Sequence, residues 1–308
     1  MQVIHIDKVD AVAPSVVCLG NFDGVHLGHQ AVIRQAVFLA NEAMPAIAYT
    51  FSRLPANQLS KGKSTPLITS NKERVDAMGN LGVNCIVMDP FRPSLSSMEP
   101  KDFFCRILLD TLNAKAIVCG TNYRFGAGGG GDTALLSSLC EEAGITLHLV
   151  RPVSHEGRVI SSSWIRALIS EGEMELAHAL IGRPYCLTAS VVHGEKRGRK
   201  LGVPTMNQLF PDWKLRPKEG VYAARAELDG HLYAATTCVS TRPTFGGSGV
   251  NSETHILGFD GDLYGRVVTI SFLKRTRGII SFESPEILRQ QLLHDIEDAR
   301  KVFDKYTH

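Results

Sequence analysis

The sequence predicts a two-domain protein in which a parallel, doubly wound α/β sheet is followed by a small antiparallel β-barrel with a C-terminal helix. Three observations support this prediction. The chain has 308 residues, its first half alternates strand patterns with helical ones, and its second half carries alternating β patterns that no helix interrupts. The pattern changes after Gly182-Arg183-Pro184, so we expect domains at 1–183 and 184–308.

Short apolar runs in the first half are predicted strands. They are mostly rich in Val, Ile and Leu, as expected for strands buried on both faces of a parallel sheet. The runs are 16–20, 46–50, 84–88, 114–120 and 146–150. Helices are predicted at 30–42, 71–81, 99–112, 132–143, 163–171 and 173–181. Strands that alternate with helices in this way predict a parallel sheet with helices on its faces.

Asp-Gly turns mark the β patterns of the second half. Asp229-Gly230 and Asp260-Gly261-Asp262 each lie between two alternating runs, which predicts a hairpin at each place. A last helix is predicted from Ser284-Pro285 to about Phe303, because serine is a good N-cap and proline suits the first helical position. Consecutive hairpins without helices between them predict an antiparallel sheet or small barrel.

The composition excludes several classes of protein. Lys and Arg number 33 and Asp and Glu 31, a net charge of +2, which is too balanced for a protein that works on nucleic acid or on an anionic membrane. No apolar run approaches the length of a spanning helix, and residues 1–10 lack the basic and apolar regions of a secretory signal. The seven scattered cysteines contain no Cys-x-x-Cys pair, which predicts reduced thiols and a cytoplasmic location.

The segment 18–29 combines a predicted strand, spaced glycines and two histidines at the start of a helix. His26 and His29 are three residues apart, so both imidazoles lie on one side of the first helical turn. Free N–H groups and the helix dipole attract anions there, and Gly24 and Gly28 let a nucleotide approach the backbone. Two imidazoles beside a triphosphate can stabilise charge on the α-phosphoryl group and on departing pyrophosphate. The alternative is that both histidines only cap the helix.

A second group of polar residues follows the domain boundary. Thr205 and Asn207 are two residues apart, so an extended segment presents their oxygen atoms on one face. Such ligands suit Mg²⁺, which binds alongside phosphates and keeps several waters. The basic, glycine-bearing loop before them contains Gly194, Lys196 and Arg199, which can meet ATP phosphates. The alternative is a solvated loop.

These segments resemble the bifunctional riboflavin kinase/FMN adenylyltransferases, the prokaryotic FAD synthetases. Residues 20–29 are similar to the His-x-Gly-His nucleotidyltransferase signature, 120–126 to the family's Gly-x-Asn-Phe-x-Phe-Gly segment, and 160–166 to its triphosphate-binding turn. The riboflavin kinase resemblance extends over most of 181–303. It includes the metal motif Gly-x-Pro-Thr-x-Asn at 202–207 and a Glu-x-His strand.

The resemblance implies a Rossmann-like nucleotidyltransferase domain that makes FAD and pyrophosphate from FMN and ATP, and a kinase domain that makes FMN and ADP from riboflavin and MgATP. It implies catalytic roles for Glu253, as the base that deprotonates a primary hydroxyl, and for His26, His29 and Arg166. Mg²⁺, ATP and flavins are expected as metal, co-substrate and substrates. The residues expected to bind ATP are Gly20, Asn21, Phe22, Gly24, Gly28, Asn122, Ser161, Ser162 and Ser163 in the first domain and Gly194, Lys196 and Arg199 in the second; Thr205 and Asn207 are the expected metal ligands.

The sequence departs from the family pattern at 51–55, at 127–131, at Met206 and at Ile279. Two alternatives to a bifunctional enzyme are a monofunctional riboflavin kinase with a weakened first domain and a flavin-responsive RNA-binding regulator that uses 196–200. The enzymes predict flavin-dependent ATP consumption, whereas the regulator predicts salt-sensitive RNA binding without turnover.

Overall fold

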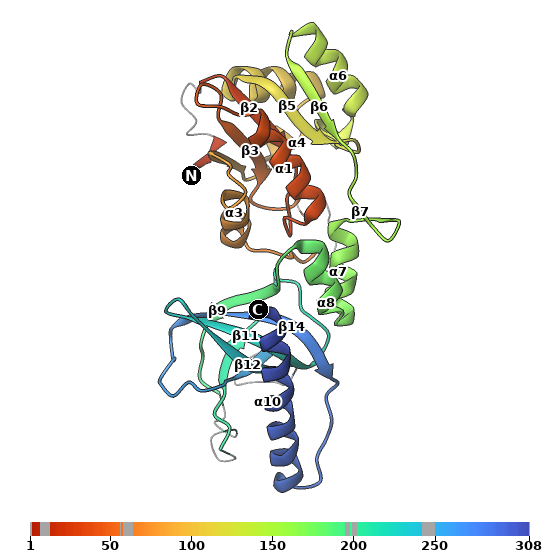
Figure 1. Cartoon of the computed structure of the whole chain (residues 1–308). Helices are drawn as coiled ribbons and strands as arrows, with labels where there is room; N and C mark the ends of the chain where they lie inside the picture. Colours follow the sequence, from red (N-terminus) through yellow and green to blue (C-terminus); the bar gives the residue numbers. More distant parts are fainter. Residues whose placement is uncertain are drawn as a thin grey trace. The chain divides into compact units, whose positions relative to one another are not determined.

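The structure is a computed structural model that describes residues 2–6, 13–55, 57, 64–194, 198, 202–241 and 250–307. The chain forms two compact units, Met1–Ser162 and Ser163–His308 (Figure 1). Helix α7 (Ser162–Glu171) and helix α8 (Met174–Ile181) therefore lie almost wholly within the second unit. The functional boundary between 183 and 184 stays a prediction. Within the described part of the chain, no helix is long and apolar enough to cross a membrane.

The first unit contains a six-stranded parallel sheet in the order β1-β4-β3-β2-β5-β6, which confirms the predicted doubly wound α/β fold. Its strands are β1 (Gln2–His5), β2 (Ser15–Leu19), β3 (Ala46–Phe51), β4 (Cys85–Asp89), β5 (Ala114–Gly120) and β6 (Thr146–Val150). From β2 the chain winds through β3 to β4, and it then returns to the other side of β2 with β5 and β6. The winding reverses between β2 and β5. In such sheets, ligands bind outside the carboxyl ends of the strands at this reversal point.

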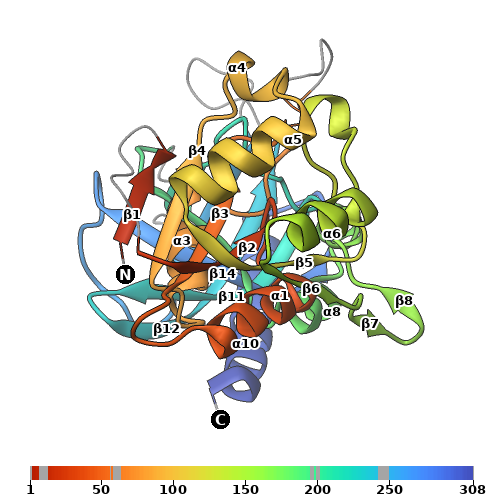
Figure 2. The ribbon, with the colours of Figure 1, turned by 90° about the horizontal axis from the view of Figure 1, so that it is seen from above.

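Helices cover both faces of this sheet (Figure 2). On one face, α1 (Leu27–Leu39) and α3 (Asn71–Gly79) share a buried core with Val16 and Cys18 of β2. On the other face, the core contains Val17 and Leu19, the alternate residues of the same strand. The π-helical η2 (Phe103–Thr111), which continues the short α5 (Pro100–Asp102), packs there together with α6 (Thr133–Glu142). The remaining elements of the unit are α4 (Pro93–Ser96), η3 (Ala127–Gly129), β7 (Ser154–His155) and β8 (Arg158–Val159).

The starts of these helices follow from local sequence. Asp132 is the N-cap of α6, where its carboxylate accepts the N–H groups of residues 134 and 135. Ser70 and Glu73 form a capping box at α3. Pro100 occupies the first position of α5, where its missing N–H leaves no helical hydrogen bond unmade.

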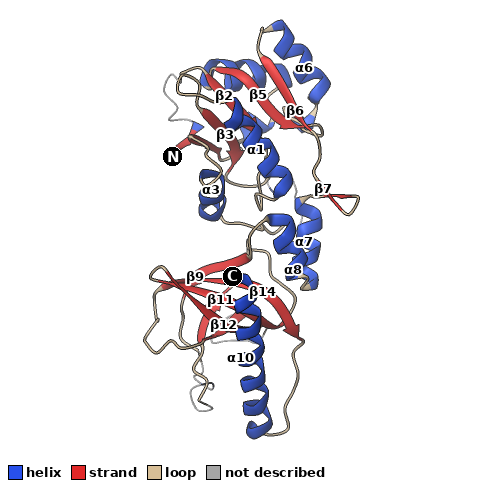
Figure 3. Ribbon diagram, viewed as in Figure 1, coloured by secondary structure: helices blue, strands red, loops and turns tan. Residues whose placement is uncertain are grey.

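The second unit is an antiparallel six-stranded sheet that curls into a near-barrel, which confirms the predicted barrel domain (Figure 3). Its order is β10-β13-β12-β11-β14-β9. The strands are β9 (Tyr185–Ser190), β10 (Met206–Leu209), β11 (Gly220–Leu228), β12 (His231–Ser240), β13 (Asn251–Ile256) and β14 (Val267–Arg277), and the C-terminal helix is α10 (Pro285–Thr307). The two end strands approach each other, because Gln208 Nε2 on β10 donates to the carbonyls of Ala189 and Val268 at 2.7 and 2.8 Å.

One predicted hairpin is confirmed and the other is wrong. Asp229 and Gly230 join β11 to β12 with φ values of +50° and +79°, as a type I′ turn requires. The strands on either side of Asp260-Gly261, β13 and β14, do not pair. Strand β13 has β10 on one edge and β12 on the other, so it has no free edge for β14, which pairs with β11 and β9.

Candidate active sites

The turn after β2 has a strained backbone. Phe22, Gly24 and Val25 have φ values of +50°, +86° and +41°. A positive φ is uncommon outside glycine and is an outlier for a β-branched valine. Phe22 and Val25 are buried in the core under α1, so packing holds the turn in this form. Backbone strain of this kind is found most often at functional sites.

His26 and His29 lie at the start of α1 with stacked rings. The ring centroids are 3.7 Å apart and the planes are inclined by 20°. His26 is the N-cap of α1, and its Nδ1 accepts the N–H of His29 at 3.3 Å. Because Nδ1 is the acceptor, a neutral His26 carries its proton on Nε2. Capping and phosphate stabilisation therefore use different atoms of the same ring, and the two expectations are compatible.

Two glycines keep space for the aromatic rings of this turn. A Cβ on Gly28 would lie 3.1 Å from Cε1 of the His26 ring. A Cβ on Gly20 would lie 2.8 Å from the ring of Phe22. At both distances the added Cβ would push the neighbouring ring from its place. The rings of His26 and Phe22 therefore restrict these two positions to glycine.

Asp23 fastens the turn to the loop before α3 and to the segment after β8. Its carboxylate accepts the N–H groups of Ile68 and Thr69 at 3.1 Å. Its backbone carbonyl accepts the hydroxyl of Ser162 at 2.9 Å. The N–H of Gly24 donates to Thr69 Oγ1 at 3.0 Å, so Gly24 is held against the loop before α3.

These elements surround a cavity of about 530 Å³ at the carboxyl ends of β2 and β5, here called the N-terminal cavity. Of the predicted residues, the cavity is lined by Gly20, Asn21, Phe22, His26, Gly28, His29, Asn122, Ser161 and Ser162. Its lining also includes five aromatic residues, Phe51, Phe91, Phe103, Tyr123 and Phe125. Burial raises the pKa of Tyr123, so its phenol stays neutral. The size and the mixed lining are typical of a small-molecule site.

The other predicted residues of the first domain lie outside this lining. Gly24 lies against the loop before α3, as described above. Ser163 and Arg166 lie on α7, in the second compact unit, where Ser163 is exposed and Arg166 is half-buried. Their part in triphosphate binding stays a prediction.

Arg74, on α3, is a residue of this region that the sequence analysis missed. It is 2% exposed, and burial lowers the pKa of its guanidinium. Nη1 donates to the carbonyl of Asn21 at 2.8 Å and Nη2 to that of Phe51 at 2.7 Å, so Arg74 ties together the ends of β2 and β3. The available signal was its spacing from Met78, which puts both residues on one face of the helix.

In the second unit, Asn207 on β10 and Glu253 on β13 stand directly opposite each other. Thr205 comes two residues before Asn207, and it lines the same cavity as Glu253. Gly194 lies against the Asn207 side chain, because a Cβ at Gly194 would be 2.2 Å from Nδ2 of Asn207. The structure thus brings four of the predicted residues together. Lys196 and Arg199 lie outside the described residues.

Two cavities share Thr205. The first, about 370 Å³, is lined by the opposite face of β10 and β13, with Met206 and Thr254, and by the 259–264 segment; it is called the loop cavity. The second, about 250 Å³, lies between the Glu253 face of the sheet and α10; it is called the helix cavity. Thr205 therefore borders both cavities.

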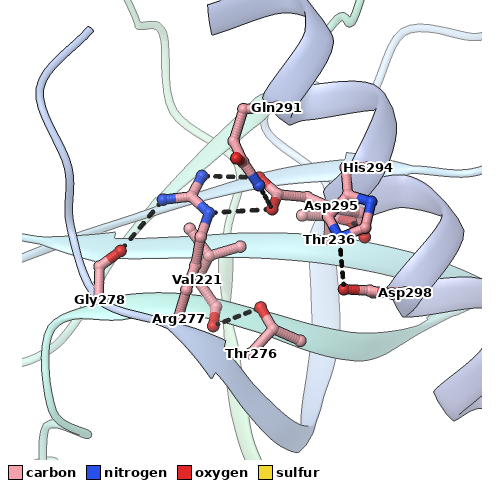
Figure 4. A network of polar contacts seen from close by, with 9 residues as sticks. All are labelled: Val221, Thr236, Thr276, Arg277, Gly278, Gln291, His294, Asp295 and Asp298. Carbon is pink, nitrogen blue, oxygen red and sulfur yellow. Dashed lines mark hydrogen bonds and ion pairs between the residues drawn. The ribbon is translucent and has the colours of Figure 1, made fainter.

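A buried ion pair lines the helix cavity (Figure 4). Arg277 Nε and Nη2 donate to the two carboxylate oxygens of Asp295 at 2.9 and 2.6 Å. Gln291 Nε2 donates to the same carboxylate at 2.9 Å. Asp295 is only 3% exposed, so the two-point pairing compensates its burial and fixes the end of β14 to α10. The sequence analysis did not single out this pair.

Comparisons with known proteins find relatives of both halves of the chain. The FAD synthetase family model matches residues 9–164 and the riboflavin kinase model matches 181–303. The chain is 32% identical over 314 residues to the bifunctional riboflavin kinase/FMN adenylyltransferase of Bacillus subtilis, with 98% of each chain covered. It is 33% identical to that of Listeria monocytogenes, with 94% of this chain and 93% of the relative covered.

Among solved structures, a Streptococcus pneumoniae protein described as a macrolide-efflux protein superposes with a TM-score of 0.88 at 31% identity, with 97% of this chain and 98% of that chain covered. The fold of the whole chain thus has a close relative. Together with the matches to both domain models and to relatives over nearly their full length, this places the chain in the family of bifunctional riboflavin kinase/FMN adenylyltransferases.

Proposed function

We propose that the N-terminal cavity carries the FMN adenylyltransferase activity of this family and that the loop and helix cavities carry its riboflavin kinase activity. The chain then makes FAD from riboflavin in two ATP-dependent steps. The observation that carries the proposal is the placement of the predicted residues in two separate sites. The histidine pair lies at the reversal point of the parallel sheet, and Glu253 lies opposite Asn207 on the barrel.

In the N-terminal cavity, a phosphate oxygen of FMN attacks the α-phosphorus of ATP, the bond to the bridging oxygen breaks, and pyrophosphate leaves. The Nε2–H of His26, with the stacked His29, stabilises the charge that develops on the transferring phosphoryl group. Ser161, Ser163 and the guanidinium of Arg166 are the phosphate contacts that the family resemblance predicts. The hydroxyl of Ser162 donates to the carbonyl of Asp23, so Ser162 can offer a phosphate oxygen only its backbone N–H. The aromatic residues of the lining favour stacking of a flat flavin ring.

In the second unit, Glu253 takes the proton of the primary hydroxyl of riboflavin as that oxygen attacks the γ-phosphorus of ATP, and ADP leaves. The helix cavity suits the flavin ring, because Leu288, Leu292 and Ile296 give it an apolar wall on α10. We assign ATP to the side of the loop cavity, and Gly194, Lys196 and Arg199 are its predicted phosphate contacts; of these, Gly194 lies against the Asn207 side chain. Thr205 lines both cavities, which supports its proposed role between the two substrates.

A Mg²⁺ ion is part of the kinase proposal, with Thr205 and Asn207 as its protein ligands. Asn207 Oδ1 accepts one hydrogen bond, from Asn251, and a carbonyl oxygen has a second lone pair for a metal. Neutral oxygen ligands suit an ion that is held mainly by phosphates and water. When bound, the ion neutralises charge on the phosphates of ATP.

Reduced cysteines support a cytoplasmic location for this chemistry. All seven cysteines are free thiols in the structure, at positions 18, 85, 105, 119, 140, 186 and 238. Burial raises the pKa of Cys18 to about 12, so this thiol is unreactive. The proposed substrates are small molecules, ATP, riboflavin and FMN, without a nucleic-acid or membrane partner.

Incubation with riboflavin, ATP and Mg²⁺, followed by chromatographic separation of FMN from FAD, tests the division of activities. Accumulation of both FMN and FAD is expected. FMN alone would replace the bifunctional proposal by a monofunctional kinase, and binding of RNA without any flavin product would favour the regulator.

A further inference from the structure

Asn251, the first residue of β13, is buried beside the two side chains on which the kinase proposal rests. Only 1% of it is exposed. It is two residues from Glu253 on the same strand, so both side chains lie on one face of the sheet. Its Nδ2 donates to Asn207 Oδ1 at 2.8 Å and to Glu253 Oε1 at 3.3 Å. A single amide group therefore connects the proposed metal ligand to the proposed base.

These hydrogen bonds define how both partners are presented. Because Asn251 donates, Asn207 turns its oxygen toward this site, while its Nδ2 lies against Gly194. The bond to Oε1 restricts rotation of the Glu253 carboxylate. A general base and a metal ligand both work best when their orientation is fixed before the substrate arrives.

Two features of this position count against asparagine as a choice for fold stability. Asparagine is disfavoured in strands. The Oδ1 of Asn251 is also buried without a hydrogen-bond partner among the residues that the structure describes, and an unsatisfied buried acceptor costs free energy. Residues that break local rules in this way are concentrated at functional sites.

We propose that Asn251 is a positioning residue of the riboflavin kinase, orienting the Glu253 carboxylate and the Asn207 amide oxygen through one shared donor. The inference rests on the roles proposed above for those two residues. Asn251 acts through them, so its loss weakens proton transfer and metal use together.

Two variants and one control test this role. Asn251→Asp replaces the donor by an acceptor of the same shape, and Asn251→Ala removes the group. Ser252→Ala is the matched control. Ser252 is equally buried on the opposite face of the same strand, and its hydroxyl has no partner among the described residues.

Both Asn251 variants should lower kcat for riboflavin phosphorylation by about 10- to 100-fold and raise the Mg²⁺ concentration needed for half-maximal activity, as loss of a supporting hydrogen bond does at metal sites. In Asn251→Asp, the added negative charge disfavours the ionised form of the neighbouring carboxylate. The acid limb of the pH–rate profile should therefore move to higher pH. FMN adenylylation should be unchanged, and Ser252→Ala should behave like the wild type.

A wild-type pH profile and wild-type Mg²⁺ dependence in Asn251→Asp would overturn the inference, even if the melting temperature fell. Asn251→Asp preserves volume, so it carries the test if Asn251→Ala fails to fold. Glu253→Gln distinguishes a failure of the kinase proposal from a failure of the positioning role of Asn251. If Glu253→Gln phosphorylates riboflavin normally, the kinase proposal fails; if it is inactive while Asn251→Asp is fully active, only the positioning role fails.

Discussion

The N-terminal cavity takes its functional groups from turns at the ends of parallel strands, whereas the kinase site takes them from side chains that stand opposite each other on antiparallel strands. In the first site, the strained backbone at Phe22 and Val25 and the start of α1 decide where the histidine rings lie. In the second, cross-strand register sets Asn207 against Glu253, and Asn251 donates to both side chains. The activity of the first site should therefore be sensitive to substitutions that change the space around its turn. The activity of the second site should be sensitive to substitutions that change the chemical groups of its side chains.

Glu253→Gln should have the largest effect, because it keeps the shape of the side chain and removes only the base. FMN formation should fall by about 10²- to 10⁴-fold, the usual contribution of general-base catalysis. FMN release is measured by chromatography. Glu227→Gln, an exposed strand glutamate on β11, is the control and should be fully active. Near-normal kinase activity in Glu253→Gln would contradict the role.

Two substitutions of His26 should distinguish its role as the N-cap of α1 from its proposed role in adenylyl transfer. His26→Asn keeps a good N-cap but lacks the imidazole, whereas His26→Ala loses both. FAD formation from supplied FMN should fall by about 100-fold or more in both variants. Thermal unfolding should distinguish them, since only His26→Ala loses about 1 kcal/mol of capping energy. Normal FAD formation in the well-folded His26→Asn would leave the ring with a capping role alone.

Removal of either proposed metal ligand should act on the kinase only. Thr205→Ala or Asn207→Ala should raise the Mg²⁺ requirement of FMN formation by something like 10-fold. The Mg²⁺ titration of FAD formation from FMN in the same variant is the internal control. An unchanged kinase titration in both variants would reject Thr205 and Asn207 as ligands.

Gly28→Ala should give a smaller effect, with opposite signs for stability and activity. Gly28 is the second residue of α1, where the gain from alanine is smaller than the about 1 kcal/mol of a helix interior, so the helix should be stabilised by a few tenths of a kcal/mol. Its Cβ would approach the His26 ring to 3.1 Å and displace it by tenths of an ångström, so FAD formation should fall roughly 10-fold. Thermal unfolding measures the change in stability, and the FAD assay on the same preparation measures the change in activity. Unchanged FAD formation would show that the ring position is not restrictive.

The sequence predicted the parallel strands and most helices closely, because apolar runs, caps and glycine stops are local signals. Strand 114–120 was predicted with the bounds that β5 has. The hairpin at Asp260-Gly261 was wrong, because a turn signal does not identify the strand that pairs. Strand β1, four residues at the sheet edge, was missed because it is too short to form a pattern.

The predicted site residues came from motif resemblance, and the structure adds the residues that hold them. Arg74, Asn251 and Asp295 lie outside the motifs, and each interacts with groups distant in the sequence, such as Asn21, 53 positions from Arg74. A buried charge such as Asp295 on the apolar face of α10 signals that it needs a partner. Only the tertiary fold identifies that partner as Arg277.

The most direct test of two separate sites is complementation between Glu253→Gln and His26→Asn, with FAD formation from riboflavin, ATP and Mg²⁺ as the readout. Alone, Glu253→Gln should make almost no FMN or FAD, and His26→Asn should stop at FMN. Mixed together, the two proteins should restore FAD, because FMN released by one kinase site reaches the adenylyltransferase site of the other chain. FAD formation by His26→Asn alone at the wild-type rate, or FMN formation by Glu253→Gln alone at that rate, would contradict the account.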